Sequence, residues 1–192
     1  MQQGMTPLAR RLTAALVTAA GIGAVMLSPA NAAAPDPRWE TARLINVDRA
    51  AHGLASLQRE AHVDALAQEW AQHIIETDDY NHRTNLNDDI IPGMWMGGET
   101  LAMFWVPSGE PISPSRTVQA WIDSERHHHV LLHDQATFIG VGVSCSWEWC
   151  VYVANVSRVN PYWKGAPLTV QIVPDPTMKP VVVQRGARKV RH

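Results

Sequence analysis

Apolar residues recur at helical spacing in the segment from residue 36 to residue 53. Asp36 can cap a helix at its N-terminus, and Pro37 suits the first helical position because an N–H group there has no helical partner. Gly53 marks the expected C-terminal end, since glycine readily adopts the left-handed conformation that stops a helix. The apolar face of this predicted helix comprises Leu44, Val47 and Ala51.

A second amphipathic segment spans residues 61–77. Its apolar stripe comprises Val63, Leu66, Ala67, Trp70 and Ile74. Residues at these spacings share one face of a helix, so the segment predicts a helix with that face against the core. His62 and His73 fall outside the stripe, and we expect both at the surface.

The pattern becomes irregular after this second helix. Residues 78–98 are rich in Asn, Asp, Pro and Gly and predict a loop that holds His82. Ser113 and Pro114 form a cap and first-position pair for a third helix. We expect this helix to turn Val118, Trp121 and Ile122 inward.

Strand-like patterns dominate the later part of the chain. Residues 138–144 and 151–156 are apolar and rich in valine, and they predict two strands. Residues 168–173 predict a further strand that could pack on the core. Helices followed by strands favour an α+β fold, and the pattern fits two or three layers equally well.

The first 32 residues form a different kind of segment. Arg10 and Arg11 precede an apolar run over residues 12–27, and Ala30-Asn31-Ala32 has the small-x-small form of a cleavage site. These features predict a secretory signal peptide and a secreted, extracellular protein. An uncleaved anchor is the alternative, although the run is short for a membrane span, and we expect no stable span after cleavage.

Two cysteines, Cys145 and Cys150, lie between the predicted strands with four residues separating them. In an exported protein such a pair favours a disulfide across the mouth of a hairpin over a pair of metal-binding thiolates. Trp147 and Trp149 lie within the loop that the disulfide would close. They could form a contact patch for sugar or lipid, but stabilisation of the hairpin is the favoured role.

Charge restricts the range of partners. The formal net charge is −2, which argues against a nucleic-acid-binding protein, because such proteins normally carry a basic stripe. Residues 164–192 are rich in proline and end in a basic stretch over residues 185–192. This region predicts a C-terminal tail that would favour anionic surfaces.

Histidines and one glutamate are the candidates for chemistry. Glu99 follows two glycines, His82 lies in the predicted loop, and His127 begins a run of three histidines. Successive side chains on a helix point about 100° apart, so the three histidines cannot share one face. His129 and His133 have the spacing of a helical zinc pair, but Val130 stands where a zincin requires glutamate. Neither a nucleophile elbow nor a phosphate-binding or dinucleotide-binding loop is present in the sequence.

Several of these stretches, taken in order, resemble bacterial members of the CAP superfamily. The matching segments are NVDRAAHGLASL at 46–57, LAQEWA at 66–71, Gly98-Glu99 with Leu101, AWIDSERHHHVLL at 120–132, TFIGVGV at 137–143 and VANV at 153–156. This family shares an SCP-like domain with cysteine-rich secretory proteins, insect venom antigen five and plant pathogenesis-related class one proteins. The resemblance implies an α-β-α sandwich, which we place at residues 36–163.

The resemblance also implies a metal site. Family members carry two histidines and two acidic residues in a cleft, and in some of them these bind a divalent metal. His82, Glu99 and His127 match three of these positions, so the resemblance predicts them as ligands of a divalent metal such as zinc. Ser124 stands where animal and plant members carry the second acid, which leaves one ligand charge fewer.

Other departures from the family pattern lie beside these candidates. Thr100 replaces the usual asparagine after Glu99, and Glu125-Arg126 replaces the Pro-Gly pair before the histidine. Two histidines and one carboxylate can nevertheless hold zinc with a water as the fourth ligand.

Three functions therefore remain open. The leading hypothesis is a secreted binding module for lipid-like, sterol-like or cell-envelope ligands, which is the ligand class that the family resemblance implies. The first alternative is a metal-dependent, protease-like hydrolase that uses a zinc-bound water, with Glu99 as ligand or general base. The second is a structural protein that contacts a protein partner and does no chemistry at these residues.

Overall fold

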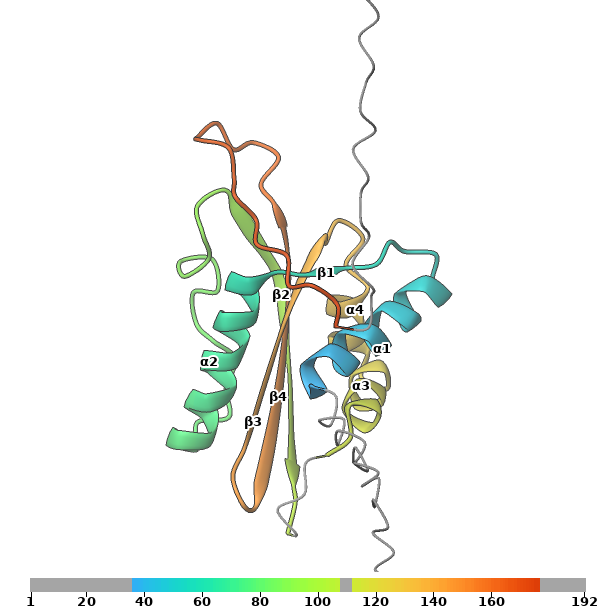
Figure 1. The fold of residues 1–192 in the computed structure, drawn as a ribbon. Coiled ribbons are helices and arrows are strands. Elements are labelled where there is room, and N and C mark those ends of the chain that lie inside the picture. Colours follow the sequence, from blue (N-terminus) through green and yellow to red (C-terminus); the bar gives the residue numbers. More distant parts are fainter. Residues whose placement is uncertain (1–35, 108–111, 177–192) are drawn as a thin grey trace, which may run out of the picture. The chain divides into compact units, whose positions relative to one another are not determined.

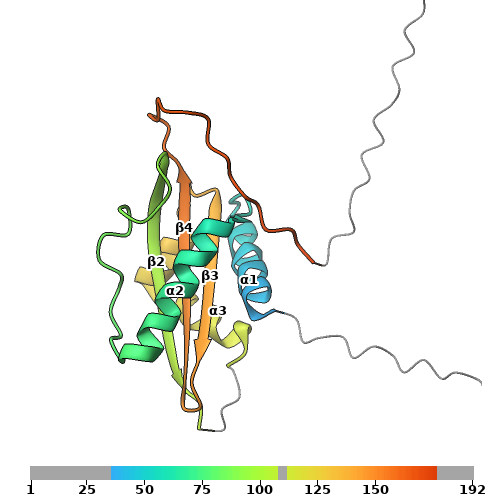
Figure 2. The same ribbon diagram turned by 60° about the vertical axis from the view of Figure 1, so that its left-hand side comes forward.

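A four-stranded sheet separates the helices into two layers (Figure 1). The computed structural model describes residues 36–107 and 112–176. The strands lie in the order β1 (Gln58–Arg59), β3 (Phe138–Cys145), β4 (Trp149–Val159) and β2 (Met94–Trp105). The helices are α1 (Pro37–Ala51), α2 (Ala61–Thr77), α3 (Pro114–Ile122) and α4 (Glu125–Leu131). Helix α2 covers one face of the sheet, and α1, α3 and α4 cover the other (Figure 2). The predicted α-β-α sandwich is confirmed.

The sheet is built around the β3–β4 hairpin. Strand β4 pairs antiparallel with β3 on one side and with β2 on the other, whereas the short β1 pairs parallel with β3. Cys145 and Cys150 face each other in the hairpin register and form the predicted disulfide. Strand β2 is therefore an edge strand, and the polypeptide before it can reach its exposed side.

Helix α2 approaches β3 closely because two glycines line the contact. A Cβ atom on Gly140 would lie 2.1 Å from the carbonyl carbon of Val63, and one on Gly142 would lie 2.1 Å from the carbonyl oxygen of Ala67. Distances this short are sterically impossible, and the backbone of α2 is not a flexible side chain that can move aside. The alternating glycines of the TFIGVGV segment therefore set the spacing between helix and sheet.

The first helix begins and ends where its sequence predicts, but its buried face differs from the predicted one. Asp36 accepts a hydrogen bond from the Arg38 N–H at 3.0 Å, and Gly53 has a φ of +72° just past the helix. The buried residues are Thr41, Ala42, Ile45 and Arg49. Val47, predicted to face inward, is 56% exposed. The buried face is therefore rotated from the predicted one, and Leu44, Val47 and Ala51 instead line a groove against α3.

Buried hydrogen bonds from Arg49 hold α1 to α4. Arg49 Nη1 donates to the carbonyl oxygens of Leu131 at 2.7 Å and His133 at 3.1 Å, at the end of α4. Its Nε donates to the Ala55 carbonyl oxygen at 2.9 Å. One arginine thus satisfies carbonyl groups from segments far apart in the chain, which explains its burial.

One predicted loop and one predicted strand need correction. The predicted loop over 78–98 ends earlier, because β2 begins at Met94, which pairs with Val159 of β4. The glycines at 97 and 98 lie within the strand at a register irregularity, where α4 packs so closely that a Cβ on Gly98 would meet Val130 at 2.9 Å. The predicted strand over 168–173 is reduced to a single bridge between Glu60 and Ile172.

The two terminal regions are only partly described. The predicted signal peptide, residues 1–32, lies outside the described residues, as do residues 177–192 of the predicted tail. Residues 168–173 contribute Leu168 and Val170 to a cluster of apolar side chains beneath α2. Among the described residues, no helix has the length and apolar character needed to cross a bilayer.

Candidate functional site

Glu99 and His82 meet at the outer edge of β2. The Glu99 side chain is only 1% exposed, and its Oε1 lies 3.0 Å from His82 Nδ1 and accepts the Arg83 N–H at 3.1 Å. Its other oxygen, Oε2, is buried and has no hydrogen-bond partner among the described residues. Buried polar atoms are normally satisfied, so this oxygen retains an unused capacity to accept a hydrogen bond.

Arg83 holds the loop that carries His82. Its Nη2 donates to the Leu66 carbonyl oxygen of α2 at 3.1 Å, and its Nη1 pairs with Asp89 at 2.9 Å. The guanidinium also lies 5.0 Å from the centre of the Trp70 ring, within the range of a cation–π contact. His82 is thereby fixed beside Glu99 while its ring remains 57% exposed.

His127 lies on α4, in a partly buried position. Burial lowers the pKa of its imidazole, and the nearby charge of His82 lowers that pKa further. Both causes disfavour the protonated ring, which is the form that cannot bind a metal. The structure therefore brings His82 and Glu99 into contact and places His127 within electrostatic reach of His82.

A different trio lies closer together. Asp48, His52 and His128 each offer a possible metal-ligand atom, and these three atoms lie within 4.8 Å of one another. In the described part of the chain, this is the one group of three or more His, Cys, Asp or Glu side chains that meets this distance. The predicted ligands His82, Glu99 and His127 do not form such a group. Their fit to a divalent metal is partial, because Glu99 Oε2 is free but His127 would have to move closer.

The sequence contained only a faint signal for the second trio. Asp48, in the last turn of α1, and His52, its C-cap, are four residues apart, a spacing that places side chains on one face of a helix. His128 belongs to the histidine run, yet it lies 80 residues from Asp48 in the chain. Nothing in the local pattern links the two segments.

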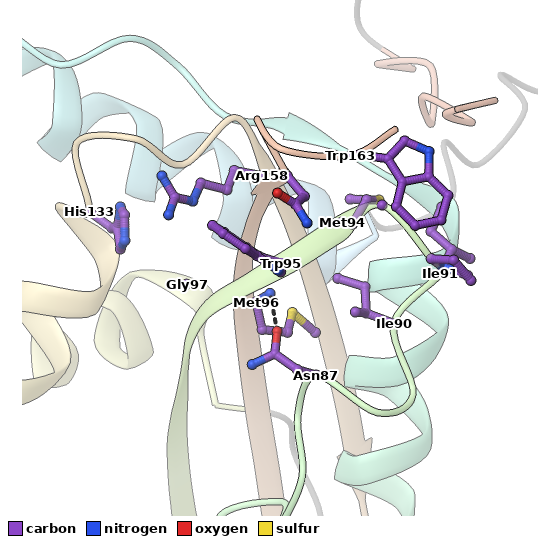
Figure 3. A pocket seen from close by; sticks show the side chains of 13 residues that line it. Asn87, Ile90, Ile91, Met94, Trp95, Met96, Gly97, His133, Arg158 and Trp163 are labelled. Atoms are coloured by element: carbon purple, nitrogen blue, oxygen red, sulfur yellow. Dashed lines mark hydrogen bonds between the residues drawn. The ribbon is translucent and has the colours of Figure 1, made fainter. Parts of the chain in front are cut away.

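A pocket of about 580 Å³ surrounds the start of β2 (Figure 3). Ile90, Ile91 and Trp163 lie on one side of the strand, and Arg158 and His133 lie on the other. The Arg158 guanidinium stacks 5.0 Å from the Trp95 ring, and no carboxylate among the described residues pairs with it. The pocket thus combines an apolar part with an uncompensated cation.

The hairpin tip carries exposed tryptophans. Trp147 is 76% exposed, and Trp149 pairs in register with Trp105, which is also exposed. Trp147 and Trp149 are therefore both accessible for the contact patch that the sequence left open.

The chain is similar to one protein family and to several solved structures. A model of the CAP family, the cysteine-rich secretory protein family, matches residues 42–156. An outer surface protein from Borrelia burgdorferi is 16% identical with a TM-score of 0.50, and the match covers 62% of this chain and 89% of that protein. An extracellular protein with an SCP domain from Bacillus anthracis is 20% identical with a TM-score of 0.48; the match covers 64% of this chain and 40% of that one.

A third solved structure is the CAP domain of Enterococcal PrgA. It is 20% identical with a TM-score of 0.41, and the match covers 62% of this chain and 59% of that one. The comparison with curated protein sequences finds no match. The family model spans more than half of the chain, from α1 to β4. The chain belongs to the CAP family, the cysteine-rich secretory protein family.

Proposed function

We propose that the protein is an exported binding module that takes an amphipathic, lipid-like ligand of the cell envelope in the pocket around the start of β2. The carrying observation is the composition of this pocket. Its volume of about 580 Å³ lies within the usual range for small-molecule sites. Export is supported by the signal-like pattern of residues 1–32 and by the Cys145–Cys150 disulfide, which is typical of an oxidising compartment.

The two sides of the pocket suit the two parts of such a ligand. Ile90, Ile91 and Trp163 offer apolar surface for a hydrocarbon or ring system. Arg158, without a carboxylate partner in the described residues, can donate hydrogen bonds to an anionic headgroup. An amphipathic anion therefore satisfies the pocket better than a purely apolar molecule or a simple sugar.

The test is a titration of the untagged protein with short-chain phosphatidylglycerol, an anionic lipid, in which tryptophan fluorescence reports binding. The same titration with phosphatidylcholine, which carries no net charge, is the comparison. We expect saturable binding of the anionic lipid. Arg158→Gln should weaken it roughly tenfold, because a charge-assisted hydrogen bond is lost. Arg126→Gln, at an exposed position on α4, is the matched control and should leave binding unchanged. Absence of saturable binding, or equal effects of the two variants, contradicts the proposal.

A metal-dependent hydrolase is the second candidate, and the unpartnered Glu99 Oε2 is the observation that favours it. Glu99 and His82 would hold a divalent metal, which supplies Lewis acidity when bound. Glu99 could alternatively accept a proton from a substrate or water through its free oxygen. The test is a screen of peptide and ester substrates with added zinc. Activity that Glu99→Gln abolishes and the exposed-site variant His129→Ala retains supports this candidate, whereas no turnover above a reaction without protein eliminates it.

A further inference from the structure

We propose that Asp48, His52 and His128 form a second binding site, separate from the His82–Glu99 pair, for a borderline transition-metal dication such as Zn²⁺. Asp48 lies in the last turn of α1, His52 is the C-cap of that helix, and His128 comes from α4. A bound ion would join the C-terminal end of α1 to α4.

The three side chains already converge. His128 Nε2 lies 2.8 Å from Asp48 Oδ2, and His52 Nδ1 lies 3.5 Å from Asp48 Oδ1. The two imidazole rings have centroids 5.2 Å apart and are nearly perpendicular, at 81°. One donor atom from each side chain lies within 4.8 Å of the other two. His52 Nδ1 also lies 2.9 Å from the Asp48 carbonyl oxygen, a contact that a bound ion would replace.

The scaffold around these donors is rigid. Arg49, the residue after Asp48, is fully buried and hydrogen-bonds the Leu131 and His133 carbonyl groups at the end of α4. The distance between the ligand-bearing turns is thus fixed by buried hydrogen bonds rather than by the ligands themselves. Ligands held on such elements bind an ion with little loss of conformational freedom.

The charge and exposure of the trio also suit a cation. Asp48 and His128 side chains are 13% and 21% exposed, while His52 is 46% exposed, so an ion and its remaining water ligands have access from one side. In the described parts of the chain, no lysine or arginine pairs with Asp48, whose ionic contacts are the two histidines. A dication would supply the positive charge that no fixed cation provides.

The donor types select the class of metal. Two imidazole nitrogens and one carboxylate oxygen form a donor set typical of zinc sites that keep a fourth position for water. Calcium and magnesium prefer several oxygen ligands, and a site with a single carboxylate offers too few. Imidazole ligands suit Zn²⁺, Cu²⁺ and Ni²⁺, so we expect these ions to bind and Ca²⁺ and Mg²⁺ not to compete.

The test is isothermal titration of the untagged full chain with ZnCl₂ at neutral pH. We expect Asp48→Asn and His128→Gln each to weaken this site by more than about 100-fold, since loss of a residue that merely supports a ligand already weakens binding by about 10–100-fold. His129→Ala, the adjacent and exposed histidine on α4, is the matched control and should bind as the unaltered protein does. Far-UV circular dichroism checks that each variant is folded. His52→Gln tests the third ligand, which is the most exposed of the three.

A second pair of variants separates this site from the one at Glu99. The Glu99→Gln, His82→Ala variant should retain zinc binding at the Asp48 trio, with the visible absorption of bound Co²⁺ as an independent readout of the ligand set. The proposal is overturned if the unaltered protein binds no zinc, or if the Asp48→Asn, His128→Gln variant binds it as tightly as the His129→Ala control. Failure of lipid binding at Arg158 would leave this result unaffected.

Discussion

Two buried carboxylates, Asp64 and Glu99, show how differently the chain uses the same chemical group. Asp64, on α2, accepts hydrogen bonds from Arg59 Nε at 3.2 Å, from Arg59 Nη2 at 2.5 Å and from the Val141 N–H at 2.9 Å. Both of its oxygens are therefore satisfied. Glu99 engages one oxygen only, and the other is buried without a partner among the described residues.

The difference separates a structural contact from a candidate site. Asp64 lies where α2 meets β3, and its bonds join that helix to β1 through Arg59 and to β3 through Val141. Glu99 lies on the edge strand beside an exposed histidine. Unused hydrogen-bonding capacity in a buried group destabilises a protein, so Glu99 should contribute less to stability than Asp64. The comparison thus predicts large stability effects at the α2–β3 contact and small ones at Glu99.

Gly140→Ala should have the largest effect. The new Cβ would lie 2.1 Å from the backbone of Val63, so α2 would have to move away from the sheet. We expect a loss of more than about 3 kcal/mol in the free energy of unfolding, above the usual range for overpacking because backbone cannot rotate aside. Urea denaturation of the unaltered protein and of Gly140→Ala measures this loss.

Gly53→Ala is the control for this variant. A Cβ at Gly53 meets nothing within 4 Å, and only its φ of +72° is unfavourable. We expect a loss of about 1 kcal/mol there. Equal losses at the two glycines would show that the close approach of α2 is not a constraint.

Asp64→Asn should follow, with a loss of about 3 kcal/mol. The substitution leaves the buried guanidinium of Arg59 without its charged partner, and an unpaired buried charge is strongly unfavourable. Burial already raises the pKa of Asp64, in spite of its hydrogen bonds to Arg59 and Val141. Glu69→Gln, at an exposed position on the same helix, is the control, and denaturation midpoints that coincide would contradict the structural role of Asp64.

The buried Tyr152 should make the free energy of unfolding depend on pH, with an effect of intermediate size. Burial raises the pKa of its phenol from 10.0 to about 12, and its hydroxyl donates to the Ile112 carbonyl oxygen at 2.6 Å. The unfolded chain therefore loses this proton first. The stabilising contribution is complete below about pH 10 and is lost as the pH rises toward about 12, by up to about 2 kcal/mol.

The measurement is the free energy of unfolding at successive alkaline pH values, for the unaltered protein and for Tyr152→Phe. The variant lacks the titrating group, so its stability should decline less steeply over this range. Tyr162→Phe, at an exposed position, is the control. Parallel declines for the unaltered protein and Tyr152→Phe would exclude Tyr152 as the cause.

Glu99→Gln should have the smallest effect, below about 1 kcal/mol. The amide oxygen can still accept the Arg83 N–H, and the lost ionic contact with His82 is partly exposed, where such pairs contribute little. Thermal or urea denaturation of Glu99→Gln and Asp64→Asn under the same conditions compares the two losses in the free energy of unfolding directly. A loss as large as that of Asp64→Asn would make Glu99 a structural residue and remove the basis for a site there.

Local pattern predicted much of the fold. The Asp36-Pro37 pair and Gly53 predicted both ends of α1, and the apolar stripe of residues 61–77 predicted α2 over the bounds that the structure has. The spacing of Cys145 and Cys150 predicted the disulfide. These features depend on hydrogen bonds and packing between residues close in the chain, so the sequence specifies them directly. His82 and Glu99, which the family resemblance implied as ligands of one metal, lie in contact, and their role as ligands stays a prediction.

Tertiary structure alone decided the rest. The glycines at 97 and 98 indicated a loop, yet pairing with β4 places them inside a strand. The buried face of α1 combines Ala42 and Ile45 with the polar Thr41 and Arg49, and the apolar pattern of the sequence had indicated another face. The approach of Asp48 to His128, 80 residues away, depends on how α1 and α4 pack. Local sequence sets which elements form, whereas contacts between distant elements follow from the packing of the whole chain, because each such contact depends on every helix and strand that positions its two partners.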